Sequence, residues 1–117
     1  MAGKNSAPAP IDRKEALERI GGDEAFLQEL LGIYDEEFQK KYDELEKAVQ
    51  EKDFQVIREA GHYLKGASAN LSLPALREAA WKMEQAGQNQ DLKTAREALE
   101  ALEREYRRLK DFLKESG

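Results

Sequence analysis

Apolar residues recur every third or fourth position along most of the chain, which is the spacing of one face of an α-helix. The pattern is most regular near the C-terminus, where it takes in Leu92, Ala95, Leu99, Leu102, Tyr106, Leu109 and Leu113. No stretch alternates apolar and polar residues as a half-buried strand does. The pattern therefore predicts an all-α protein.

Local signals divide this pattern into helices. Asp23, Asp53 and Asp91 each precede an apolar stripe and are predicted to cap the helices that follow. These long helices are expected over about 24–51, 54–71, 74–87 and from 92 onward, after a short helix over 12–20. Gly21-Gly22 is predicted to end the short helix, because glycine tolerates the left-handed conformation of a helix stop. Pro74 is predicted to open the helix that ends near Gly87, since proline suits a first helical turn.

Four long helices joined by short turns bury their stripes most simply as an antiparallel, up-down-up-down four-helix bundle. The short N-terminal helix would cover one end. Residues 1–10 are small, polar and proline-bearing without a hydrophobic period, so we expect a disordered lead-in or linker there. Residues 11–117 are expected to form one bundle domain.

Composition narrows the classes of function. The 117 residues include no cysteine, which excludes disulfides and thiolate metal sites. No apolar run approaches the roughly 20 residues that cross a bilayer, and the N-terminus lacks a signal-peptide segment, so we expect a cytoplasmic location without membrane association. The formal net charge of −5 argues against nucleic acid as a partner.

His62 is the chain's one histidine and the main candidate for chemistry. It falls off the apolar stripe of its helix, so the imidazole should lie in or near water. Lys65, three residues on, places a cation on the same face, which disfavours imidazolium and favours a neutral, nucleophilic ring. Gly66 stands in a helix interior, where glycine costs about 1 kcal/mol relative to alanine. Its missing side chain would let another molecule approach the ring.

The segment His62-Tyr63-Leu64-Lys65-Gly66-Ala67-Ser68-Ala69-Asn70-Leu71 resembles the signature of histidine-containing phosphotransfer (HPt) domains of two-component phosphorelays. That signature runs His, any residue, Leu, Lys, Gly, then small residues and a hydrophobe. Ile20-Gly21-Gly22-Asp23 and Met83-Glu84 also resemble the family, and the likeness extends over about residues 12–115. Where family members commonly continue with Gly-Ala, this chain has Ser72-Leu73, a departure that bears on the turn more than on the site.

The resemblance implies a role for each matching residue. His62 would accept the phosphoryl group through its outward ring nitrogen, Lys65 would stabilise the phosphoryl oxygens, and Gly66 would keep the approach open. Glu84 falls where family members often place a Gln or Glu that orients the ring, although an ordinary solvated helix residue explains it equally well. Leu17, Ile20 and Phe26 are expected in the core, with a docking surface as the alternative.

The resemblance also implies a phosphocarrier without kinase activity. The chain has no glycine-rich nucleotide loop and is not expected to use ATP. Receiver domains of response regulators or hybrid histidine kinases would be the partners, and Mg²⁺ would be held by the receiver alone. The domain itself is expected to be monomeric and to need no cofactor.

Four alternatives compete with this interpretation. Glu59-Ala60-Gly61-His62 fits the Glu-x-x-His step of di-iron bundles, but a single histidine cannot supply the second such motif. Haem ligation by His62, with Met83, would need the imidazole in an apolar pocket. A bundle of the same fold kept only for structure or protein interaction stays open, as does the N-terminal domain of a chemotaxis-type kinase.

Overall fold

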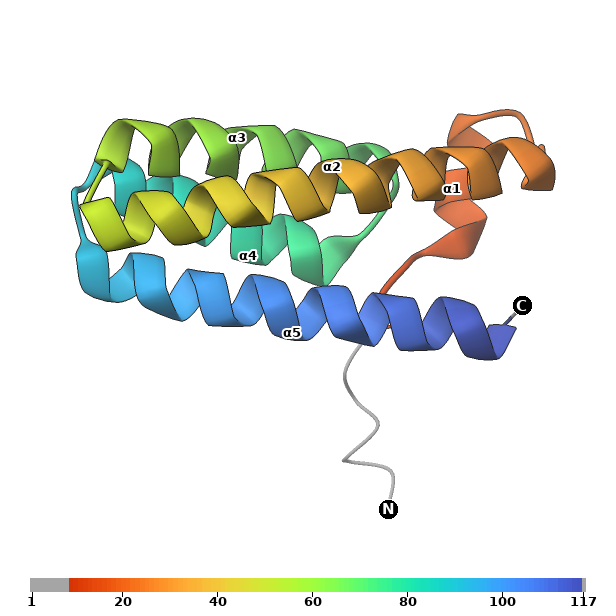
Figure 1. Cartoon of the computed structure of the whole chain (residues 1–117). Helices are drawn as coiled ribbons and strands as arrows, with labels where there is room; N and C mark the ends of the chain where they lie inside the picture. Colours follow the sequence, from red (N-terminus) through yellow and green to blue (C-terminus); the bar gives the residue numbers. More distant parts are fainter. Residues whose placement is uncertain (1–8, 117) are drawn as a thin grey trace, which may run out of the picture.

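The computed structural model describes residues 9–116, which form five helices and no strand. The helices are α1 (Arg13–Arg19), α2 (Glu24–Glu51), α3 (Phe54–Asn70), α4 (Pro74–Gln88) and α5 (Leu92–Ser116). Helices α2 to α5 run antiparallel to their neighbours in the chain, with α1 at one end (Figure 1). The predicted bundle and its helix limits are therefore confirmed. Most of the lead-in predicted over residues 1–10 lies outside the described residues.

Aspartate side chains open the helices as the sequence indicates. The carboxylates of Asp23 and Asp53 accept the backbone N–H groups of residues 26 and 56 at 3.0 and 3.2 Å. Asp91 accepts the Thr94 N–H at 3.1 Å, and Asp12 opens α1 in the same way. Each cap satisfies an otherwise unpaired N–H at a helix start, which stabilises a helix by about 1 kcal/mol.

The core is a continuous cluster along the axis of the bundle. Its largest fully buried members come from all four long helices and the α3–α4 turn: Phe38, Leu27, Leu45, Ile57, Leu64, Leu73, Leu76, Met83 and Leu102. Phe38 of α2 stacks on Tyr106 of α5 with ring centroids 4.2 Å apart. The apolar stripes predicted for the long helices thus meet in one core.

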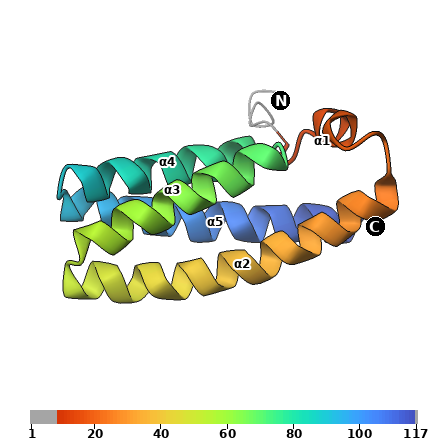
Figure 2. The ribbon, with the colours of Figure 1, turned by 90° about the horizontal axis from the view of Figure 1, so that it is seen from above.

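Phe26 is an exception to the predicted core, because its side chain is exposed. It lies in the first turn of α2, which extends past the shorter α3 and α4 (Figure 2). Leu17 and Ile20 are partly buried and pack against the core, as predicted. The core assignment is therefore wrong for Phe26 alone among these three.

Helix α1 covers the end of the bundle at which α3 meets α4 (Figure 2). Ile11 and Ala16 are buried there, and the Asp12 N–H donates to the Ser72 carbonyl at 2.8 Å. Ser72 has a φ of 59°, a left-handed conformation that suits glycine better than serine. The family's usual glycine is thus missing where the backbone favours it, yet the chain still makes the turn. Gly21 and Gly22 end α1 at φ 81° and 85°, as predicted.

Candidate functional site

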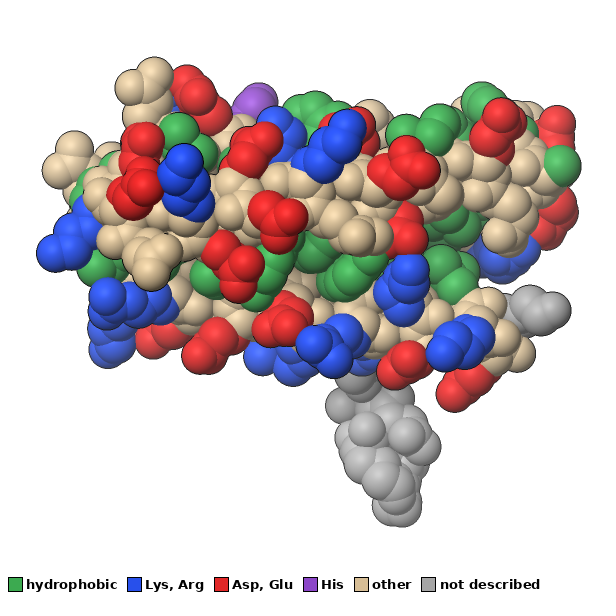
Figure 3. All heavy atoms as spheres, in the orientation of Figure 1, with side chains coloured by type: hydrophobic (Ala, Val, Ile, Leu, Met, Phe, Trp, Pro, Cys, Tyr) green, Lys and Arg blue, Asp and Glu red, His purple; other side chains and the backbone are tan. Residues whose placement is uncertain are grey.

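His62 lies on the outer face of α3, opposite the residues that anchor this helix in the core. Ile57, Ala60, Leu64 and Ser68 are buried on the inner face. The His62 side chain is 68% exposed, so a partner can reach its ring (Figure 3). The exposed location predicted from the apolar stripe is confirmed. A haem pocket around this imidazole is ruled out by the same exposure.

Glu84 of α4 reaches across to His62. Its Oε2 lies 2.8 Å from Nδ1 of the imidazole, and its Oε1 lies 2.7 Å from Nζ of Lys65. The Glu84 side chain is only 15% exposed, whereas the imidazole that it contacts is open to solvent. One carboxylate therefore joins the imidazole and the ammonium, and Glu84 is not the ordinary solvated residue that the sequence left open.

The charge on Glu84 decides how the imidazole is protonated. The hydrogen bond from Lys65 holds the pKa of the Glu84 carboxyl below its ordinary value, helped by the hydrogen bond from His62 and opposed by partial burial. Glu84 is therefore ionised at neutral pH and can only accept hydrogen bonds. Nδ1 of His62 must then carry a proton and donate it to Oε2. In the neutral ring this leaves the Nε2 lone pair free.

The position of Lys65 changes the charge argument made from the sequence. Lys65 lies on the same face of α3 as His62, as its spacing predicts, but its ammonium forms an ion pair with Glu84. The charged group that contacts the ring is the carboxylate. The spacing of residues along one helix cannot show which charges a neighbouring helix adds.

Gly66 lies on the exposed side of α3, one helical turn beyond His62. A Cβ built at this position meets no atom within 4 Å, so packing within the domain does not require glycine. Gly66 therefore leaves open surface beside the imidazole.

Tyr63, which follows His62, was not singled out from the sequence. Its hydroxyl donates to Glu37 Oε1 of α2 at 3.1 Å, and Nζ of Lys41 lies 4.7 Å from the centre of its ring. The side chain is 44% exposed and lines a groove between α2 and α3 with Ile33 and Ala67. Its place beside His62 in the sequence was the available signal, but its contacts depend on the register of α2 against α3.

The rest of the described chain offers neither a metal site nor a membrane-spanning helix. In residues 9–116 no group of three or more His, Asp or Glu side chains is placed to hold a metal ion. No helix in this range is both long and apolar enough to span a membrane. The candidate site therefore consists of His62, Lys65 and Glu84, with Gly66 beside them.

An exposed histidine on a four-helix bundle, held through one ring nitrogen by a carboxylate that also pairs with a lysine, is the arrangement of a histidine phosphocarrier. The family model described as Hpt domain matches residues 29–112, which is most of the chain. The chain therefore belongs to the Hpt domain family. Hpt domains carry phosphoryl groups in phosphorelays, act together with receiver domains and are not kinases. A search of curated proteins finds no match to this chain.

Proposed function

We propose that His62 accepts a phosphoryl group from the phosphoaspartate of a receiver domain and passes it to the aspartate of another receiver. The observation that carries this proposal is the exposed imidazole whose Nδ1 lies 2.8 Å from the Glu84 carboxylate. An exposed ring with one nitrogen engaged presents the other nitrogen in a fixed direction. That arrangement suits a nucleophile that must meet phosphorus in line.

In the forward step, Nε2 attacks phosphorus while the bond from phosphorus to the aspartyl oxygen breaks. The aspartate leaves as a carboxylate, and the phosphorylated ring keeps its proton on Nδ1. This ring is cationic, so the adjacent Glu84 carboxylate stabilises it. The return step reverses these changes when a second receiver offers its aspartate.

Lys65 and Gly66 act on the incoming group in this proposal. The Lys65 ammonium lies on the same helix face as His62, one turn away, and can exchange its ion pair with Glu84 for one with the phosphoryl oxygens. Gly66 leaves space for the receiver because no side chain projects there.

The receiver would approach across α2 and α3. Ile33 and Tyr63 are exposed apolar or aromatic residues on these helices, and both line the groove between them. Exposed apolar surface beside a polar site is typical of a protein interface. Phe26 is also exposed, so the docking alternative considered from the sequence now fits it better than the core.

The remaining parts of the proposal rest on the sequence and the family. The receiver would hold the Mg²⁺ needed for transfer, and this domain would need no cofactor or ATP. We also predict that the domain is monomeric and located in the cytoplasm, with receivers of response regulators or hybrid kinases as partners.

The decisive experiment is ³¹P NMR of the protein mixed with a phosphorylated receiver at neutral or basic pH, where phosphohistidine is stable. A phosphoramidate resonance is expected for the wild type and not for His62→Gln. Lys65→Ala should give the same resonance at a slower rate. Circular dichroism checks that His62→Gln keeps its helicity.

A resonance that persists in His62→Gln contradicts the proposal. Silence of the wild type with several receivers, and with a small phosphoramidate donor, also contradicts it. That second result would favour a bundle kept for structure or protein interaction.

A further inference from the structure

Two glycines mark the closest approach between α3 and α4. A Cβ built on Gly61 would lie 2.6 Å from the backbone N and 2.9 Å from the Cα of Glu84. A Cβ built on Gly87 would lie 2.4 Å from the backbone N and 2.7 Å from the Cα of Arg58. Both clashes are with backbone, which cannot turn aside as a flexible side chain can. Any residue other than glycine at either position must push the two helices apart.

The two contacts are reciprocal. Gly61 of α3 receives the backbone of α4, and Gly87 of α4 receives the backbone of α3. Arg58 and Gly61 are three residues apart, as are Glu84 and Gly87, so each pair spans about one helical turn. The contacts therefore fix both the separation and the register of α3 against α4 over that turn.

The same turn carries the site. Gly61 directly precedes His62, and the backbone that it touches is that of Glu84. The Glu84 side chain must span the gap from this backbone to Nδ1 at 2.8 Å and to Lys65 Nζ at 2.7 Å. A hydrogen bond is lost once donor and acceptor separate beyond about 3.5 Å. Moving α4 away from α3 far enough to fit one methyl group would therefore break the contact between Glu84 and His62.

We propose that Gly61 and Gly87 are positioning residues that set the α3–α4 separation at which the Glu84 carboxylate holds Nδ1 of His62. Neither glycine touches the reacting atoms, and both act through Glu84. This inference rests on the proposed function for its effect on phosphotransfer, but the contact itself exists in the domain without a partner.

The test measures which nitrogen of His62 carries the proton, by ¹⁵N NMR of the unphosphorylated domain near neutral pH. In the wild type the neutral ring is expected with its proton on Nδ1. In Gly61→Ala and Gly87→Ala the fraction of this tautomer should fall by roughly half or more, as in Glu84→Ala. Phosphotransfer from a receiver should slow by roughly ten- to hundredfold in the two glycine variants.

Gly32→Ala is the matched control. Gly32 also lies in a helix, but a Cβ there meets nothing within 4 Å. The same substitution should leave the His62 tautomer and the transfer rate unchanged. The double variant Gly61→Ala with Glu84→Ala should show no larger tautomer shift than Glu84→Ala alone. Both substitutions remove the same contact, the one between Glu84 and His62.

A wild-type tautomer in folded Gly61→Ala or Gly87→Ala overturns the positioning role. If both variants lose their helical circular dichroism, the glycines serve the fold as a whole and the proposal is equally wrong. The tautomer assay needs no receiver. A domain that shows the predicted shift but accepts no phosphate would contradict the proposed function and leave the positioning contact standing.

Discussion

The hydroxyl of Tyr34 lies 2.9 Å from the hydroxyl of Ser68, and this hydrogen bond joins α2 to α3 inside the core. Both residues are buried, and burial raises the pKa of the Tyr34 phenol above its ordinary value, so the phenol keeps its proton. Ser68 lies on the inner face of the helix that carries His62 on its outer face. The hydrogen bond therefore ties α3, the helix that carries His62, to α2.

Tyr34→Phe should lower the free energy of unfolding by about 1–2 kcal/mol, because it leaves the buried Ser68 hydroxyl without its partner. Ser68→Ala should cost a similar amount by stranding the phenol. The double variant should cost less than the sum of the two, since it leaves neither group unpaired. Urea denaturation measures all three, and strictly additive losses would show that the two hydroxyls do not depend on each other.

Ser72→Gly should stabilise the protein by about 1 kcal/mol. Serine holds a left-handed φ of 59° at this position, which costs an L-residue energy that glycine does not pay. The serine hydroxyl is also buried and has no hydrogen-bond partner among the described residues, so its removal strands nothing. Thermal or urea unfolding measures the gain, and a loss of stability would mean that the hydroxyl has a role in the turn.

The sequence predicted the helices well because their determinants are local. Capping aspartates and the apolar period depend on residues a few positions apart, and both were found where expected. The same apolar period accounts for the burial of Tyr34 and Ser68 on the inner faces of their helices. Their mutual hydrogen bond was not predicted, since it depends on the register between two helices that share no local signal.

In the site too, features set within one helix were predicted, and features that depend on contacts between helices were not. The exposure of His62 and the proximity of Lys65 follow from spacing on one helix. Glu84 came only from the resemblance to a family, because its contact needs α4 to lie at a particular height against α3. The close packing that sets this height depends on Gly61 and Gly87, and only the structure shows which backbone atoms they contact.

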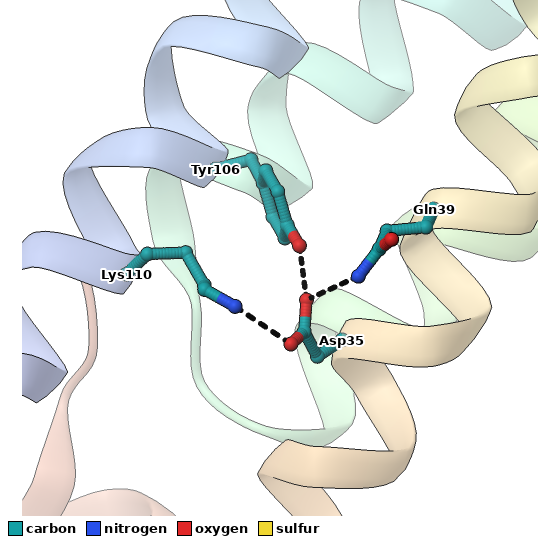
Figure 4. A network of polar contacts seen from close by, with 4 residues as sticks. All are labelled: Asp35, Gln39, Tyr106 and Lys110. Atoms are coloured by element: carbon teal, nitrogen blue, oxygen red, sulfur yellow. Dashed lines mark hydrogen bonds and ion pairs between the residues drawn. The ribbon is translucent and has the colours of Figure 1, made fainter.

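The ionisation of Asp35 should make the free energy of unfolding depend on pH. Burial opposes its ionisation, but hydrogen bonds from Lys110, Tyr106 and Gln39 together hold the pKa of the Asp35 carboxyl below its ordinary 3.8 (Figure 4). Lys110 and Tyr106 belong to α5, so the network ties α5 to α2. A carboxylate with a lowered pKa stabilises the folded state at pH above 3.8. That contribution fades as the pH falls through the lowered value.

Asp35→Asn should therefore lose about 0.5–1 kcal/mol of stability at pH 7, a modest amount because the pair with Lys110 is partly exposed. The difference between the variant and the wild type should shrink as the pH is lowered below 3.8. Urea denaturation at a series of pH values measures it. A difference that stays constant down to acid pH would show that the charge of Asp35 contributes nothing.

Ile33→Ser tests the proposed docking face. Ile33 is 53% exposed, so its replacement should change the free energy of unfolding by no more than about 0.5 kcal/mol. Transfer from a receiver should require a higher receiver concentration, because apolar contact area is lost. Phosphorylation by a small phosphoramidate donor should be unaffected.

Gln50→Ser, an exposed change in the last turn of the same helix, is the control. Equal behaviour of the two variants toward the receiver would place the interface elsewhere.

Substitutions of Gly66 should affect stability and phosphotransfer differently. Alanine at this open, helical position should stabilise the isolated domain by about 0.5–1 kcal/mol, since glycine is the poorer helix former and a Cβ meets nothing. A bulky residue, as in Gly66→Leu, should keep much of that stability yet block transfer from a receiver. Stability is measured by urea denaturation and transfer by the decay of the phosphorylated receiver.

Gly32→Leu provides the comparison, because it makes the same change at an open helical glycine of α2. It should gain similar stability and keep normal transfer. The contrast is informative because packing inside the domain demands glycine at neither position. Normal transfer by Gly66→Leu would mean that the receiver does not approach over this turn of α3, and the role proposed for Gly66 would have to be abandoned.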